Sequence, residues 1–117
     1  MDRLLKTYLR TFRRRWGLTQ TELAFLIGVK SNTLVSRFEE LKRTPNLSAA
    51  FACKIIFDAS LAELFPGLFD DVQEAVYLRA NELYEELQGS SSKATRTKLD
   101  FLEAVLSRSE RSTEKHV

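Results

Sequence analysis

The chain has 117 residues, 44% of them hydrophobic and 29% charged, which suits one ordinary folded domain with a short appendage and excludes a disordered chain. No apolar run approaches the ~20 residues that a membrane-spanning helix needs. The basic N-terminal part lacks the apolar region of a signal peptide, and the single cysteine, Cys53, cannot form an internal disulfide. We therefore expect a cytoplasmic protein.

The charges are unevenly distributed along the chain. Residues 1–58 carry 11 Lys or Arg against 5 Asp or Glu, an excess of six positive charges, whereas residues 59–117 carry 7 against 11. The net charge of +2 conceals this difference. A polyanion would attract the first half and repel the second, although an uneven solvated surface would give the same count.

Apolar spacing predicts six or seven helices and no strand, and therefore an all-α fold. The first helix has an apolar face at 4-3-4 spacing, formed by Leu5, Leu9, Phe12 and Trp16. Gly17 ends this helix. A short second helix opens at Thr19, which can form a capping box with Glu22, and it closes at Gly28.

The next three helices are also marked by caps and turns. The third begins near Ser31 or Asn32, and Pro45 lies in the turn that follows it. We expect the fourth helix to bury a core stripe of Leu47, Phe51 and Ile55, with Ala50 beside it. A brief fifth helix, 61–65, is capped by Ser60 and Glu63 and stopped by Pro66 and Gly67. The aromatic residues at helical spacings are expected in the core: Phe12, Trp16, Phe51, Phe57 and Phe65.

Beyond this point the sequence predicts a separate helical extension. An amphipathic helix runs from Asp70 to about Gln88, and its apolar stripe consists of Phe69, Val72, Val76, Leu83 and Leu87. Residues 89–92 form a flexible break before one more helix, marked by Leu99, Leu102, Val105 and Leu106. We therefore divide the chain into a bundle at 1–66 and an extension at 67–117. The stripe could form a dimer contact, or it could pack back on its own domain.

The second and third helices have the pattern of a helix-turn-helix unit. Ala24 is small where the two helices would cross, and Gly28 can take the positive φ that a tight turn demands. Val35 and Phe38 would fasten the third helix to the core. Its other face would then carry the polar residues Ser31, Asn32, Thr33, Ser36 and Arg37. A helix presented in this way fits the major groove of DNA.

Several stretches in order resemble the Cro/phage-repressor (Xre) family over roughly residues 5–66. They are Gly17-Leu18-Thr19-Gln20-Thr21-Glu22-Leu23-Ala24, Ile27-Gly28-Val29, Val35-Ser36-Arg37-Phe38-Glu39, Arg43-Thr44-Pro45-Asn46-Leu47 and Ser60-Leu61-Ala62-Glu63-Leu64-Phe65. The resemblance implies a five-helix lambda-repressor-like bundle, to which this chain adds one or two C-terminal helices.

The resemblance also implies residue roles. Arg37 would reach base edges, where an arginine can grip guanine with two hydrogen bonds, and Ser31, Asn32, Thr33 and Ser36 would read bases beside it. Alternatively, Arg37 is a solvated residue or a phosphate contact. The expected phosphate-binding residues are Thr19, Gln20, Thr21, Lys30, Lys42 and Arg43. Arg13 and Glu39 match a buried salt bridge that ties the first helix to the third.

Two departures from the family pattern affect these roles. One extra residue lies between Gly28 and Val35, so the residues from Lys30 to Thr33 have no unique match. Leu41 stands where the family has a glycine in the left-handed conformation, which would cost leucine ~1 kcal/mol or more. Otherwise the third helix runs on and the turn is rebuilt.

The sequence gives no sign of an enzyme. It has no glycine-rich phosphate loop, no metal-ligand cluster and no nucleophile with a histidine base, and its one histidine is His116. We therefore expect no catalysis, no metal and no cofactor.

The resulting hypothesis is a transcriptional regulator that binds double-stranded DNA, a repressor-type homodimer reading a two-fold symmetric operator through residues 31–40. It makes no membrane contact. The main alternative is an antitoxin or phage-switch protein whose residues 67–117 bind a partner protein. A degenerate helix-turn-helix protein that has lost DNA binding is the third possibility.

Overall fold

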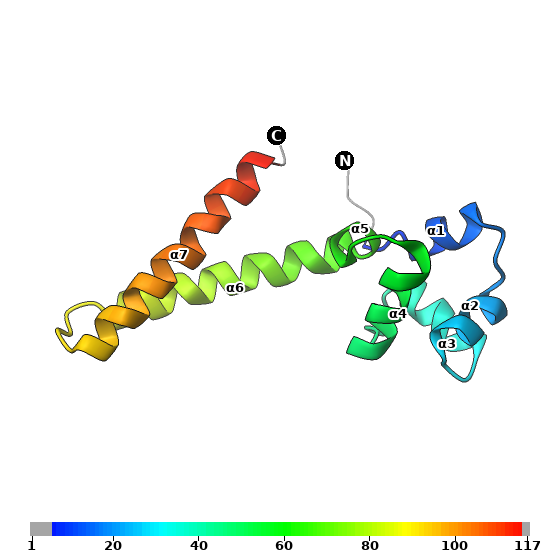
Figure 1. The fold of residues 1–117 in the computed structure, drawn as a ribbon, viewed down its shortest axis with the longest axis horizontal. Helices are drawn as coiled ribbons and strands as arrows, with labels where there is room; N and C mark the ends of the chain where they lie inside the picture. Colours follow the sequence, from blue (N-terminus) through cyan, green and yellow to red (C-terminus); the bar gives the residue numbers. More distant parts are fainter. Residues whose placement is uncertain (1–5, 116–117) are drawn as a thin grey trace. The chain divides into compact units, whose positions relative to one another are not determined.

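A computed structural model describes the backbone of residues 6–115 and the side chains of residues 6–109. Leu5 and His116 lie outside the described residues. Within the described part every regular element is a helix, so the predicted all-α class is confirmed, and two helices follow the five of the bundle where one or two were expected (Figure 1). The helices are α1 Leu9–Arg15, α2 Gln20–Ile27, α3 Asn32–Glu39, α4 Leu47–Phe57, α5 Leu61–Leu64, α6 Pro66–Leu87 and α7 Lys93–Lys115. The chain forms two compact units, Met1–Asp70 and Asp71–Val117.

Local hydrogen bonds explain where the short helices begin. Thr19 and Glu22 form a reciprocal capping box at α2, and Ser60 and Glu63 form another at α5. Asn46 caps α4 by accepting a hydrogen bond from the backbone N–H of Ala49, over 2.8 Å. Each cap satisfies a backbone donor that has no partner within its helix.

The core of the N-terminal unit is built from all five of its short helices. Its buried apolar members are Leu9, Leu23, Ala24, Val35, Phe38, Ala49, Cys53, Phe57, Ala59, Leu64 and Phe65. The backbone carbonyl of Leu64 accepts hydrogen bonds from the Tyr8 N–H and the Thr7 hydroxyl, over 2.8 and 3.1 Å. These bonds tie α5 to the residues just before α1, which closes the bundle.

The expected core stripe of α4 is wrong. Leu47, Phe51 and Ile55 are exposed, and the helix instead buries Ala49, Cys53 and Phe57. The buried set is offset by two positions, about 200° around a helix, so it occupies the opposite face. Apolar spacing alone does not distinguish two faces that are both apolar.

Trp16 is also not a core residue, because its side chain is largely exposed. Helix α1 ends at Arg15, and the chain turns at Gly17, whose φ is 72°. Trp16 therefore lies just past the last helical residue. Among the other aromatic residues, Phe57 and Phe65 are buried as expected, and Phe12 is half-buried with its ring centroid 5.7 Å from that of Phe57.

Helix α6 begins four residues earlier than the sequence suggested. Pro66 and Gly67 do not separate two helices, because α6 starts at Pro66. Proline is tolerated in the first turn of a helix, where its missing N–H would have no helical partner. The break between α5 and α6 lies at Phe65, which has φ −131° and ψ 60°.

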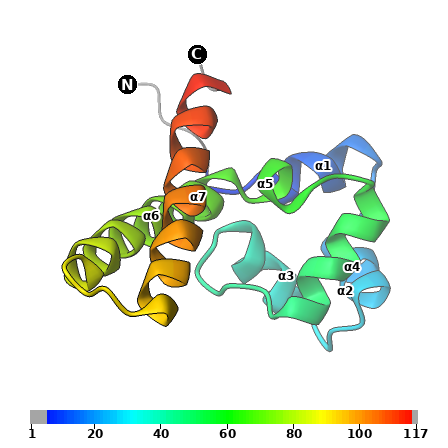
Figure 2. The same ribbon diagram turned by 60° about the vertical axis from the view of Figure 1, so that its left-hand side comes forward.

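The C-terminal unit has little interior of its own. It consists of the later part of α6 and of α7, which diverge from the turn at 88–92 (Figures 1 and 2). Among its described side chains only Ala80 and Leu102 are buried. The Tyr84 hydroxyl of α6 donates to the Glu103 carboxylate of α7 over 2.8 Å. This hydrogen bond raises the pKa of Tyr84.

Candidate nucleic-acid interface

Helices α2 and α3 pack against each other and are joined by a tight turn, residues 28–31. The carbonyl of Ala24, a buried residue, accepts hydrogen bonds from the N–H groups of Gly28 and Val29, over 2.9 and 3.0 Å. Gly28 has φ 93°, in the left-handed region that favours glycine. The turn therefore ends α2 and redirects the chain into α3.

Helix α3 has one buried face and one outward polar edge. Val35, Phe38 and Glu39 are buried against the rest of the bundle. Four of the five predicted base-reading residues lie along the solvent-facing side of α3: Asn32, Thr33 and Arg37, which are exposed, and Ser36, which is half-buried. The fifth, the exposed Ser31, precedes the helix as its N-cap in extended conformation.

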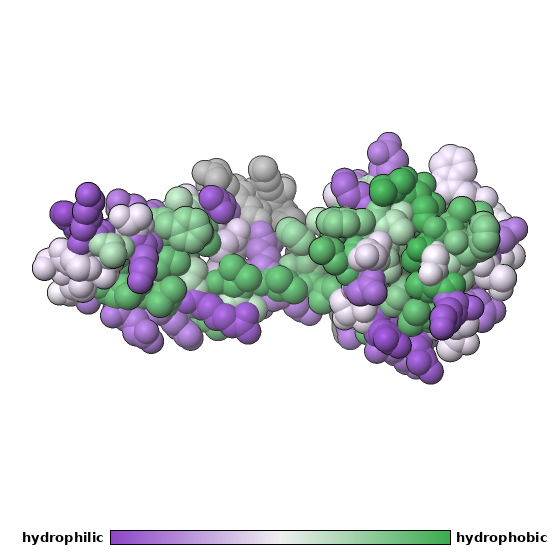
Figure 3. Space-filling view, turned by 60° about the horizontal axis from the view of Figure 1, so that its bottom comes forward, coloured by the Kyte–Doolittle hydropathy of each residue, from purple (hydrophilic) through white to green (hydrophobic). Residues whose placement is uncertain are grey.

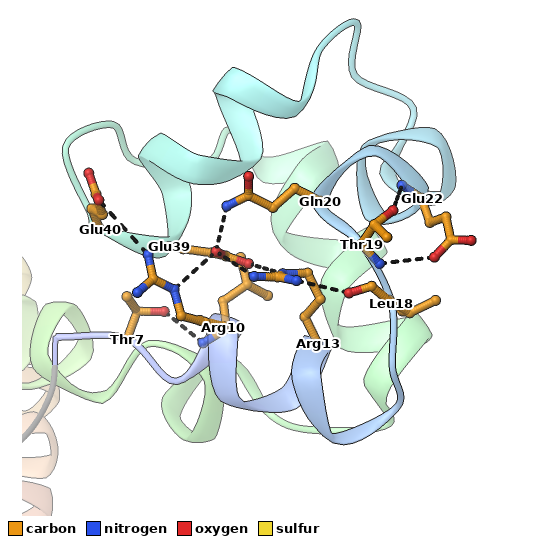
Figure 4. A network of polar contacts seen from close by, with 10 residues as sticks. Thr7, Arg10, Arg13, Leu18, Thr19, Gln20, Glu22, Glu39 and Glu40 are labelled. Carbon is orange, nitrogen blue, oxygen red and sulfur yellow. Dashed lines mark hydrogen bonds and ion pairs between the residues drawn. The ribbon is translucent and has the colours of Figure 1, made fainter.

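Glu39 fastens α3 from behind through a cluster of polar contacts (Figure 4). Its carboxylate accepts hydrogen bonds from Arg13 Nε and Nη2, from Arg10 Nε at 3.4 Å and from Gln20 Nε2 at 3.0 Å. Arg13 also donates to the carbonyl of Leu18 over 2.8 Å. One buried carboxylate therefore joins α1, α2 and α3.

The cluster keeps Glu39 ionised. Burial by itself would raise the pKa of Glu39, but hydrogen bonds from Arg13 and Gln20, together with the charge of Arg13, outweigh that effect. The net result is a pKa below the ordinary range of a glutamate. Arg13, buried and engaged on both sides, is not available to a ligand.

The beginning of α2 forms the second part of the surface. An open hollow there is lined by Arg10, Arg13, Arg14, Leu18, Thr19 and Gln20. The Thr19 hydroxyl is used by the helix cap, and the Gln20 amide N–H is used by Glu39, while the exposed Thr21 hydroxyl accepts from Asn32 over 3.4 Å. The exposed Arg14 adds positive charge to the same hollow. The Thr19 N–H donates to the Glu22 carboxylate, so the hollow offers an anion the backbone N–H of Gln20 at the helix start together with the nearby cations.

Helix α3 ends in a Schellman turn despite its leucine. Leu41 has φ 55°, and its N–H donates to the carbonyl of Phe38, while the N–H of Lys42 donates to the carbonyl of Arg37. The half-buried Leu41 side chain packs against the core. Of the two alternatives for this departure, the structure therefore has the strained leucine and not a longer helix.

Exposed cations lie on both sides of α3 in the sequence. Lys30 precedes it, and Lys42 and Arg43 follow it. Lys42 forms a surface ion pair with Glu40 at 3.4 Å.

Sequence reasoning missed the part that Arg10 plays. Besides its bond to Glu39, it lies 3.9 Å from the carboxylate of Glu40. A signal was available, since Arg10 precedes Arg13 by three residues and therefore shares its helix face. Within the described residues no group of acidic, histidine and cysteine side chains could hold a metal ion. None of the described helices is long and apolar enough to cross a membrane.

A short capped helix, a glycine turn and a second helix with an outward polar edge define a helix-turn-helix protein. No family model and no solved structure matches the chain. The chain is 39% identical, over 67 residues, to an uncharacterized HTH-type transcriptional regulator of Archaeoglobus fulgidus, a match covering 57% of this chain and 91% of that protein. A second such regulator of the same organism is 33% identical over 67 residues, covering 57% and 90%. The chain therefore belongs to the HTH-type transcriptional regulators.

Proposed function

We propose that the protein is a sequence-specific DNA-binding regulator of the Cro/phage-repressor (Xre) kind, a repressor-type homodimer that reads a two-fold symmetric operator. The observation that carries this proposal is the presentation of α3. Its polar edge faces outward, while Val35, Phe38 and Glu39 hold it to the bundle from behind. Arg37 and Asn32 are the side chains best suited to bidentate contacts, with guanine and adenine respectively.

Phosphate contacts would fix this helix in register. The hollow at the beginning of α2 supplies the backbone N–H of Gln20, the second carboxamide hydrogen of the same residue and the charge of Arg14. Lys30, Lys42 and Arg43 extend the positive charge to both ends of α3. Such contacts provide affinity but little sequence information. Discrimination between DNA sequences would therefore depend on the outward edge of α3.

A homodimer is proposed because one recognition helix covers only a few base pairs, whereas two copies can read half-sites about 34 Å apart. The C-terminal unit supports it. Its part of the α6 stripe leaves Val72, Val76 and Leu83 exposed beside the buried Ala80, and the exposed Phe69 precedes it on the same helix. Two diverging helices cannot enclose such a stripe, and pairing with the same unit of a second copy would do so.

Two variants of α6 test the dimer contact. Val76→Glu places a charge on the stripe, whereas Leu78→Glu places the same charge on the opposite face of the helix at a similarly exposed position. We expect only Val76→Glu to halve the mass measured by light scattering and to weaken binding to a palindromic site. Equal mass and equal DNA affinity of the two variants would show that the stripe is not the dimer contact.

Selection of binding sites from random duplex DNA with the full chain tests the proposed function. We expect a palindromic consensus and an affinity that falls steeply with salt. Arg37→Ala should lose 1–3 kcal/mol of discrimination at one base pair, roughly 5- to 150-fold, whereas Lys42→Ala should weaken binding to all sequences alike. Arg108→Ala, an exposed arginine on α7, is the matched control and should change neither. The absence of any enriched sequence contradicts the proposal.

A second candidate function is the capture of a partner protein by residues 67–117, as in an antitoxin or a phage-switch protein. The same exposed stripe on α6 favours it. In that case, the Val76→Glu variant would keep its mass and its DNA affinity and lose only the partner.

A further inference from the structure

Helix α4 is apolar on both of its faces, and the chain buries only one of them. Ala49, Cys53 and Phe57 lie inside the bundle. The outer stripe, defined as Leu47, Phe51 and Ile55, is 67%, 50% and 78% exposed. A globular protein normally buries a helix that is apolar all round. We therefore expect the outer stripe to be buried in a contact with another surface.

The outer stripe lies on a helix with little charge, whose C-cap is the exposed Asp58. Within α4 the only charged residue is Lys54. The centres of interfaces are depleted of charge, whereas an ordinary solvated helix face is not. Figure 3 shows hydrophobic surface gathered on the N-terminal unit, at the right of the view.

We propose that the outer stripe of α4 binds the same stripe of a second copy, with the two helices antiparallel and crossing at Phe51. The spacing is symmetric, since Leu47 and Ile55 lie four residues to either side of Phe51. A two-fold axis at Phe51 therefore sets Leu47 of one copy against Ile55 of the other. Lys54 then faces the small Ser48 of the other copy and not a second lysine.

The area of the stripe decides how strong this contact is. Three partly exposed side chains offer roughly 400 Å² of apolar surface per copy, about half of the ~800 Å² per partner of a standard stable interface. The contact is therefore weak between free molecules. It becomes populated when another interaction, such as the proposed dimer of C-terminal units or a shared DNA segment, holds copies close together. This inference goes beyond the proposed function and does not require DNA binding.

Disulfide trapping with the full chain tests the crossing directly. Helices in contact bring facing Cα atoms to the spacing of a disulfide, so Phe51→Cys chains should cross-link across the two-fold axis. Two Ile55→Cys thiols would lie ~12 Å apart along the helices, too far for a disulfide. A mixture of Leu47→Cys and Ile55→Cys chains should form the mixed disulfide that neither forms alone. The native Cys53 is buried and its pKa is raised to about 11, so it contributes little background.

The matched control is Phe25→Cys on α2, where the side chain is 83% exposed. Random collision would cross-link the variants in order of exposure, with Phe25→Cys fastest and Phe51→Cys slowest. The proposed contact reverses this order, and we expect Phe51→Cys to react at least about tenfold faster than the other two. Rates that follow exposure overturn the proposal.

Sedimentation equilibrium of the unmodified chain provides a second measurement. The weight-average mass should rise with concentration in a step that the double variant Phe51→Glu/Ile55→Glu lacks. Both positions are exposed, so the variant should keep the helical content and melting temperature of the native protein. Identical mass curves for a folded variant would overturn self-association through the stripe.

Discussion

Removal of the Glu39 side chain should cost the N-terminal unit much of its stability. The Glu39→Ala variant takes away the carboxylate that accepts hydrogen bonds from Arg10, Arg13 and Gln20. Arg10 is half-exposed, so water can replace its lost contact. Arg13 is buried and would retain only the carbonyl of Leu18. The cost therefore arises mainly from an unpaired buried guanidinium.

The magnitude follows from that burial. The side chain of Arg13 is 10% exposed and that of Glu39 is fully enclosed. Breaking such a pair by removing one partner costs ~3–5 kcal/mol. A unit of 70 residues is stable by roughly 4–10 kcal/mol, so the variant should lose about a third of this stability or more. The double variant Arg13→Ala/Glu39→Ala should cost clearly less than the two single variants together, with a coupling of about 1–3 kcal/mol.

Urea unfolding measures these free energies. Far-UV circular dichroism reports all helices, and the fluorescence of Trp16, the only tryptophan, reports the N-terminal unit. Lys42→Ala, which breaks the exposed pair with Glu40, is the control and should cost at most ~0.5 kcal/mol. If Glu39→Ala costs as little as this control, the account of Glu39 as the fastening of α3 is refuted.

Three further predictions concern single groups in the N-terminal unit. The lowered pKa of Glu39 stabilises the fold fully above the unfolded pKa of about 4.3, and this stabilisation is lost as the pH falls through the folded pKa; urea midpoints should therefore fall more steeply in acid for the native chain than for Glu39→Gln. Leu41→Gly and Leu41→Ala both lose the half-buried side chain, but only Leu41→Gly also relieves the backbone strain of ~1–2 kcal/mol. Leu41→Gly should therefore have the higher melting temperature of the two variants. The opposite order in thermal melts would contradict the strained turn. Burial raises the pKa of Cys53 to about 11, so a thiol reagent at pH 8 should label the native chain at least about 100-fold more slowly than the chain in urea, and equal rates would place Cys53 at the surface.

The parts of the fold that depend on local chemistry could be read from the sequence. The Thr19–Glu22 and Ser60–Glu63 pairs predicted two helix starts, because a capping box is formed by residues three apart. Gly28 predicted the end of α2 for the same reason, since its backbone conformation is a local property. The pairing of Arg13 with Glu39 spans 26 residues and came only from a family resemblance.

The sequence-based predictions were wrong mainly where packing between distant parts of the chain determines which residues are buried. In α4 two apolar stripes compete, and only the packing of the other helices determines that Cys53 is inside and Phe51 outside. Helix α1 ends at Arg15, before the predicted helix would have included Trp16, and the Trp16 side chain is therefore exposed to solvent. At Pro66 the sequence signal was ambiguous in principle, because a proline both stops one helix and suits the first turn of the next.

The two faces of α3 separate two kinds of evolutionary constraint. The anchoring residues Val35, Phe38 and Glu39 tolerate little change, because each is buried among partners. The outward residues Asn32, Thr33 and Arg37 contribute almost nothing to the core, so replacing them should alter stability by only about ±0.5 kcal/mol. Under the proposed function, a duplicated gene could therefore acquire a new target preference through a few substitutions on this edge, while the scaffold that positions them stays intact.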